Sequence, residues 1–144
     1  MTSIEEKLNQ VERMIRECDL DELGFAFAIL NEIIIDNRAT NDQIAEALNL
    51  KGLIVGGPAP CHTEYEEDET GLIYYLQSFS YNPRNSSVLL NIVNSFTDHD
   101  MRQPFTLENK LAFIKAYEIL KNDLYDTLNK ESKNNLLNFS AKYD

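Results

Sequence analysis

One short segment of the chain combines side chains that can hold a metal ion or act as a nucleophile. Cys61 and His62 are adjacent, Glu64 follows shortly after them, and His99 is the only other histidine of the sequence. A catalytic zinc site needs three protein ligands in fixed geometry, and a thiolate nucleophile needs a base beside it. A metal-dependent hydrolase that uses these four residues is therefore one functional hypothesis.

The same residues have a simpler interpretation. Adjacent Cys61 and His62 would have to turn back onto one ion from a proline-containing loop, and Asp98-His99-Asp100 is typical of a polar turn between helices. The sequence contains no glycine-rich phosphate loop, nucleophile elbow, His-Glu-x-x-His motif or calcium-binding loop. We therefore predict no enzymatic activity, no bound metal and no cofactor.

A run of carboxylates lies next to this segment. It consists of Glu64, Tyr65, Glu66, Glu67, Asp68 and Glu69. Aromatic rings beside carboxylates make good anchors for Arg and Lys side chains, and a solvated loop that leads into a helix N-terminus is the alternative. Asp42 and Glu46 form a second acidic set, and Tyr74 is a further aromatic candidate unless it is a packing residue. We predict that all of these residues contact a partner.

The charge of the chain is concentrated in its first half. The 144 residues include 24 acidic and 13 basic ones, a net charge of −11. Residues 1–70 contain 16 acids and 5 bases, whereas residues 71–144 contain 8 of each. Such an acidic surface repels DNA, RNA and anionic lipid and attracts basic proteins. We predict a basic protein partner and exclude nucleic-acid and membrane partners.

Length and composition indicate one domain in a reducing compartment. With 43% hydrophobic residues the chain can bury a core without disulfides or metal. Its apolar stretches fall short of the about 20 residues that cross a bilayer, and its acidic start lacks the pattern of a secretory signal. Cys18 and Cys61 are too few for a disulfide framework. We predict a single cytoplasmic domain over residues 1–144 with reduced thiols.

Helical periodicity dominates the elements that must position these residues. Ile4, Leu8, Val11 and Ile15 recur at helical spacing and predict a helix over 4–17. Capping-box patterns, Ser-x-x-Glu at 3–6 and Thr-x-x-Gln at 40–43, mark two helix starts. Further helices are predicted over 23–34, 41–55, 71–81 and 86–96, from 106 onward, and once or twice near the C-terminus.

The predicted fold class is all-α, with about seven helices in antiparallel pairs. The segment 23–34 is apolar nearly all round, which is typical of a helix buried between neighbours. We therefore expect this helix to form the core of the N-terminal half. Only the run 33–35 favours a strand, and it lies inside a longer helical pattern.

A repeat is visible along the chain. Similar first helices begin their pattern at Leu8, Leu48 and Leu89, at intervals of 40 and 41 residues. In the middle unit, the segment 71–78 has small, aromatic and small residues at helical spacing, and Pro83 follows it. This spacing resembles the tetratricopeptide repeat (TPR), in which small residues allow two antiparallel helices to approach closely.

The resemblance covers about residues 40–121 and extends weakly to 4–38. It departs from the TPR pattern at Lys51, where Leu is usual, at Val93, where Gly is usual, and in the absence of a closing proline in the third unit. The resemblance implies a short α-solenoid of stacked helix pairs whose concave surface binds a protein segment. A plain helical bundle is the alternative.

A small acidic helical-repeat chain without catalytic motifs is also similar to immunity proteins of bacterial toxin systems, including those of contact-dependent growth inhibition. These proteins often neutralise basic nuclease toxins. The similarity implies an inhibitor that is steered to a toxin by charge and occludes its positively charged active site. A secretion chaperone or adaptor that holds a peptide in a concave groove is the alternative among binding proteins.

Overall fold

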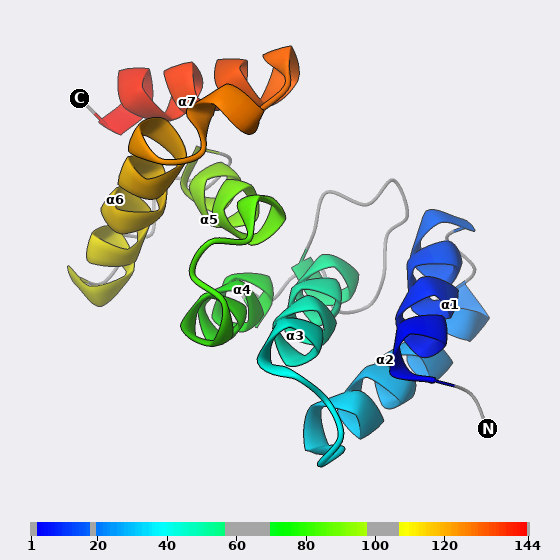
Figure 1. Cartoon of the computed structure of the whole chain (residues 1–144). Helices are drawn as coiled ribbons and strands as arrows, with labels where there is room; N and C mark the ends of the chain where they lie inside the picture. The colour runs from blue at the N-terminus through cyan, green and yellow to red at the C-terminus, as the bar shows by residue number, and fades with distance from the viewer. Residues whose placement is uncertain (1–2, 18–19, 57–69, 98–106, 144) are drawn as a thin grey trace. The chain divides into compact units, whose positions relative to one another are not determined.

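The computed structural model describes residues 3–17, 20–56, 70–97 and 107–143 (Figure 1). Within these ranges it contains seven α-helices, one short 3₁₀ helix and no β-strand, so the all-α prediction is confirmed. The elements are α1 (Ile4–Glu17), α2 (Leu20–Ile35), α3 (Asn41–Gly56), α4 (Thr70–Tyr81), α5 (Ser86–Thr97), α6 (Leu107–Asn122), η1 (Tyr125–Thr127) and α7 (Lys130–Tyr143). They form two compact units, the N-terminal unit (Met1–Pro83) and the C-terminal unit (Arg84–Asp144).

Side-chain caps fix where the helices begin. The Ser3 Oγ accepts a hydrogen bond from the Glu6 backbone N–H at 3.1 Å, which starts α1. At α3, the Thr40 Oγ1 accepts from the Gln43 N–H at 3.1 Å, and the Gln43 Oε1 accepts from the Thr40 N–H at 3.0 Å. The predicted capping box at Thr40 and Gln43 is confirmed, and Ser3 caps α1 through one of the two bonds of that motif. These bonds satisfy N–H groups that have no partner inside the helix.

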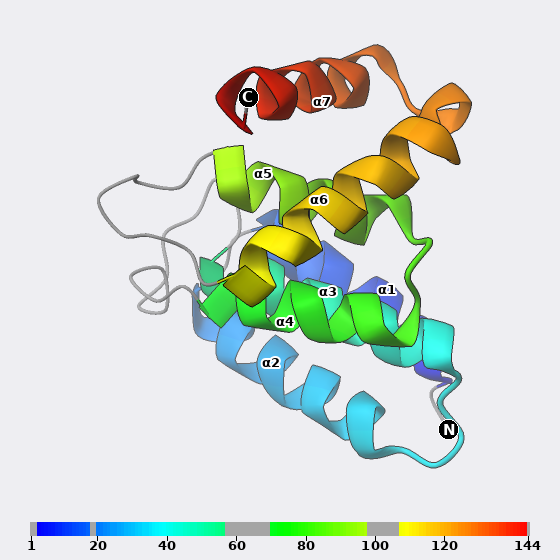
Figure 2. The same ribbon diagram turned by 90° about the vertical axis from the view of Figure 1, so that its left-hand side faces the viewer.

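The N-terminal unit is organised around α3. This helix packs against α1, α2 and α4, and α3 and α4 run antiparallel, as α1 and α2 do (Figures 1 and 2). Residues 47–52 of α3 are buried at every position. The apolar stripe of α1 faces this core as predicted, with Leu8 and Val11 4% and 0% exposed.

The prediction that residues 23–34 form the core of the N-terminal half is confirmed in part. Leu23, Ala26, Ile29, Leu30 and Ile33 belong to the buried cluster of this unit, but the helix is not buried all round. The helix α2 contributes fully buried Leu30 and Ile33 to the core, but Phe25 is 62% exposed and Ile35, at its last position, is 80% exposed. The reason is that α2 packs against α1 and α3 through one side. Its apolar composition therefore exceeds what its neighbours cover, and the central position belongs to α3.

The C-terminal unit is built by α5, which packs against α6 and α7. Its core contains fully buried residues from all three helices, among them Leu89, Ile92, Phe113 and Leu120, while Phe139 is 2% exposed. The rings of Tyr117 and Phe139 lie 5.0 Å apart between α6 and α7.

Each of the two units has its own core. Whether they fold as the single domain predicted for residues 1–144 stays a prediction. None of the helices in the described ranges is long and apolar enough to cross a membrane. Cys18 and Cys61 lie outside the described residues, so the prediction of reduced thiols is untested.

Candidate protein-binding surface

Most side chains that the sequence singles out lie outside the described residues. They are Cys61, His62, Glu64, Tyr65, Glu66, Glu67, Asp68, Glu69, Asp98, His99 and Asp100. Within the described ranges, no group of three or more His, Cys, Asp or Glu side chains could hold a metal ion. The hydrolase hypothesis and the contact role of the acidic run therefore stay predictions. Asp42, Glu46 and Tyr74 are described.

The second acidic set lies on the first turns of α3. Asp42 is exposed, Glu46 is half-buried, and the two are one helical turn apart. The carboxylate of Asp42 is favourably placed because the N-terminal end of a helix carries partial positive charge. Nearby, the Gln43 Nε2 donates to the Glu5 Oε1 at 3.1 Å and ties this end of α3 to α1. Asp42 is thus the more accessible of the two predicted contacts.

Tyr74 is half-buried and belongs to a cluster around the ammonium group of Lys51. The Lys51 Nζ lies 4.4 Å from the ring centroid of Tyr74 and 4.6 Å from that of Phe27. The two rings meet edge to face, with centroids 6.2 Å apart. The Lys51 Nζ also donates to the Asn31 Oδ1 at 2.7 Å. Three helices, α2, α3 and α4, are joined at this point.

The cluster explains why Lys51 is compatible with a position where the TPR pattern has leucine. Lys51 is only 9% exposed, so its aliphatic stem is buried in the core like that of a leucine. The two aromatic rings and the Asn31 oxygen replace part of the water that the ammonium group loses. Burial nevertheless lowers the pKa of Lys51, because removing water disfavours the charged form.

Two buried side chains of α4, Ser78 and Tyr75, carry hydroxyl groups. Ser78 is fully buried, and its Oγ donates to the Ala45 carbonyl oxygen at 2.5 Å. Tyr75 is 2% exposed, and its hydroxyl has no hydrogen-bond partner in the described part of the chain. Burial raises the pKa of Tyr75 well above its ordinary value, because the phenolate form cannot be hydrated there.

The turn between α2 and α3 is held by an ion pair. The Asp36 Oδ2 lies 2.9 Å from the Arg38 Nη2, and its Oδ1 accepts from the Arg38 backbone N–H at 2.9 Å and from Nε at 3.1 Å. These hydrogen bonds, from the side chain first and the backbone second, lower the pKa of Asp36 to about 2. The turn thus keeps a carboxylate ionised in moderately acidic solution.

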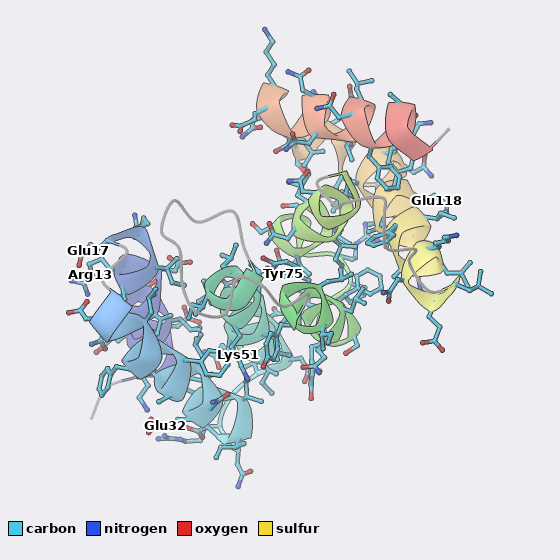
Figure 3. All side chains as sticks on the ribbon, turned by 180° about the vertical axis from the view of Figure 1, so that it is seen from behind. Arg13, Glu17, Glu32, Lys51, Tyr75 and Glu118 are labelled. Carbon is cyan, nitrogen blue, oxygen red and sulfur yellow. The ribbon has the colours of Figure 1, made fainter. Side chains whose placement is uncertain are left out.

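The net charge divides at the boundary between the units. Residues 1–83 contain 16 acids and 5 bases, and residues 84–144 contain 8 of each. Exposed carboxylates occur on all of the first three helices, at Glu5, Glu6, Glu17, Glu22, Glu32 and Asp42. Bases offset them in part: Arg13 lies one turn from Glu17 on α1, and Lys7 lies 3.9 Å from Glu32 (Figure 3). The N-terminal unit therefore presents a predominantly acidic surface.

The sequence interpretation missed the uncovered side of α2. Two signals in the sequence could have revealed it. The segment 23–34 is apolar all round, and the short turn at Asp36 to Arg38 leads directly from it into the next helix. A helix at the edge of a unit has fewer neighbours than its composition suggests. No family model, curated protein or solved structure matches the chain.

Proposed function

We propose that the chain is a protein-binding module built from diverged TPR-like helix pairs. The pairs are α1–α2, α3–α4 and α5–α6, and α7 is an additional terminal helix. In the N-terminal unit α3 packs against both helices of the preceding pair as well as against α4, its own partner. Such packing is what a stacked array requires, because each repeat covers the apolar face of its neighbour.

The pattern residues of the middle pair support this assignment. Gly52 is buried on α3, and Ser78 is buried on α4, where its Oγ donates to the Ala45 carbonyl oxygen of α3, so a small side chain occurs where the two helices approach. Tyr75 has the aromatic position and is 2% exposed. Pro83 closes the unit two residues after the end of α4.

The function that these features support best is neutralisation of a basic protein, in the manner of an immunity protein that binds a toxin such as a nuclease. The observation that carries it is the coincidence of charge and packing: the whole net charge of −11 belongs to the unit that ends at Pro83. A charge of one sign on one unit attracts a basic surface over about the Debye length of 8–10 Å. Solubility alone does not require such a partition.

In the proposed mechanism the acidic surface accelerates the encounter and short-range contacts hold the complex. The acidic unit would cover the positively charged cleft in which the toxin binds its substrate, so the substrate would be excluded by volume and by charge. Electrostatic steering of this kind raises association rates by about 10- to 1,000-fold, and the effect falls with ionic strength. The chain itself supplies no chemical step in this mechanism.

The test is identification of the partner by affinity purification from the source cells, followed by kinetics with the purified pair. We expect a partner of basic isoelectric point, an association rate that falls steeply between low and high salt, and loss of the partner's own activity in a one-to-one mixture. A partner of acidic isoelectric point, or an affinity that is the same at both salt concentrations, would contradict the proposal. The chaperone alternative predicts an affinity that is the same at both salt concentrations.

A further inference from the structure

The outer side of α2 is an apolar surface that the described residues of the N-terminal unit leave uncovered. Phe25 is 62% exposed and Ile35 is 80% exposed, and Ala28 between them is exposed as well. Residues 25, 28, 32 and 35 follow one another at helical spacing and share one face about 15 Å long. We call Phe25, Ala28, Glu32 and Ile35 the α2 outer face. Single exposed apolar residues are common on proteins. Two large ones also occur together on α6, at Leu107 and Leu111, but Lys110 lies beside them there, whereas α2 has no basic residue.

Gly24 borders this face and has no role in the packing of the unit. It lies in the interior of α2 and is exposed, and a Cβ atom added there would meet nothing within 4 Å. Glycine is a poor helix former, so folding alone favours alanine at this position. The missing side chain leaves the helix backbone open to close approach from outside.

The charges around the face define what it can bind. The helix α2 contains Asp21, Glu22 and Glu32 and no lysine or arginine. Glu22 is exposed, and the Glu32 side chain is 68% exposed and projects from α2 (Figure 3). Its contact with Lys7 is long, at 3.9 Å, and is therefore easily exchanged for a new partner.

We propose that the α2 outer face is the docking site for an amphipathic, basic helix of the partner. The apolar side of that helix would cover Phe25 and Ile35, and its flanking Lys or Arg side chains would reach Glu22 and Glu32. The basic character of the occupant rests on the proposed function. A second copy of the chain fits poorly, because two copies of α2 would place carboxylates against carboxylates and would bring together two charges of −11.

The experiment uses the full-length protein and a synthetic peptide of about 20 residues that places Leu on one helical face and Lys on the others. There are two control peptides. The first has the same Leu and Lys residues in an order that gives no apolar helical face, and the second keeps the apolar face but has Glu in place of each Lys. Affinity is measured by fluorescence anisotropy at two salt concentrations, and the contact surface is mapped by amide chemical shifts. We expect the amphipathic basic peptide to bind best and to shift the amides of α2.

Variants locate the binding. Phe25→Ser and Ile35→Ser should each weaken binding of the basic peptide about tenfold or more, because each removes an anchor of the contact. Ile73→Ser on α4 and Leu137→Ser on α7 are matched controls, since both residues are exposed, at 52% and 66%, and belong to other helices; they should leave the affinity unchanged. All four variants should unfold at the wild-type urea midpoint, because the residues are exposed.

Gly24 separates binding from folding. Gly24→Gln should raise the unfolding midpoint, because it replaces a glycine inside a helix, and should weaken peptide binding, because its side chain fills the approach to the α2 outer face. A variant that is more stable but binds more weakly cannot be explained by damage to the fold. Gly24→Gln with wild-type affinity would overturn the proposal.

The outcomes distinguish this proposal from the proposed function. If the basic peptide binds in a salt-dependent manner but the α2 variants bind it equally well, the docking site is wrong and a basic partner stands. If only the acidic peptide binds, both are wrong. If the protein self-associates in sedimentation and Ile35→Ser abolishes this, the face is covered by a second copy, and the proposed occupant is wrong.

Discussion

The two units of the chain have different residues at the position three after the first leucine of the sequence repeat. In the N-terminal unit this position is Lys51, whose charged end meets two aromatic rings and an amide oxygen between three helices. In the C-terminal unit the matching position is Ile92, which is 0% exposed in an apolar core. The N-terminal unit also carries the whole net charge, whereas the C-terminal unit is neutral. Both units need an apolar core to fold. Among the described residues, the N-terminal unit adds a buried lysine to its core and carries the net negative charge.

The difference indicates where selection for something other than folding has acted. A neutral surface over an apolar core is the default for a stable helical unit. The N-terminal unit instead combines repelling carboxylates, a half-desolvated cation, an exposed glycine in a helix and two large exposed apolar side chains on α2. Each of these features disfavours folding or solubility to some degree, and the proposed basic partner would account for them together. Exposed apolar side chains alone do not separate the units, because Leu107 and Leu111 on α6 are 72% and 57% exposed.

Exchange at the shared repeat position gives the largest expected effect. Ile92→Lys should lower the free energy of unfolding by about 4 kcal/mol, because it buries an ammonium group in an apolar core. Lys51→Ile should change it by no more than about 1 kcal/mol, because an apolar residue replaces a cation that is already partly desolvated. Urea unfolding monitored by circular dichroism measures both. Equal effects of the two substitutions would remove the contrast between the units.

Truncation of each core tests whether the units are separate. Leu30→Ala on α2 and Leu120→Ala on α6 each remove a fully buried side chain, which should cost about 3 kcal/mol. Because each unit has its own core, hydrogen exchange should accelerate mainly in the unit that contains the substitution. If either substitution accelerates exchange equally in both units, the chain is one cooperative domain, as the sequence predicts.

Charge reversal tests the partition of charge directly. Replacing Glu66, Glu67, Asp68 and Glu69 by Lys should slow association with the partner by about 10- to 100-fold at low salt. The matched control replaces four exposed acids of the C-terminal unit, Glu108, Glu118, Asp126 and Glu131, by Lys. Both variants have the same net charge, so a difference between them measures location alone. Equal rates would mean that only the total charge matters.

Acid titration gives the smallest expected effect and concerns the turn of the N-terminal unit. The pKa of Asp36 is about 2 in the folded state, below its ordinary value, so its ion pair with Arg38 stabilises the fold above about pH 4. That contribution should disappear as the pH falls from about 4 to about 2. Asp36→Asn and Arg38→Gln should both flatten this part of the stability profile relative to the wild type. Identical profiles for all three proteins would contradict the assignment.

Helix content and helix starts could be predicted from the sequence because they depend on local interactions. The helical spacing of apolar residues gave α1 with the observed bounds, and the pattern at Thr40 and Gln43 gave the start of α3. Each of these features is determined within a few residues of the chain or by the period of one helix.

The arrangement of the site could not be predicted, because it depends on contacts between distant helices. Lys51 was only a departure from a repeat pattern, and nothing in its neighbours along the chain indicated that Phe27 and Tyr74 would meet its ammonium group. The exposure of Phe25 was missed for the same reason, since composition does not reveal how many neighbours a helix has. The acidic run lies outside the described residues, so its role depends on the charge-reversal experiment.

The buried hydroxyl of Tyr75 gives the protein an internal optical probe. The chain has no tryptophan, so its near-ultraviolet absorbance comes mainly from its 7 tyrosines. Because burial raises the pKa of Tyr75, its phenolate absorbance at alkaline pH should develop later than that of the exposed tyrosines, when α4 opens enough to hydrate the hydroxyl. The rate at which that absorbance develops after a pH jump would therefore report how often the helix pair opens, without any attached label.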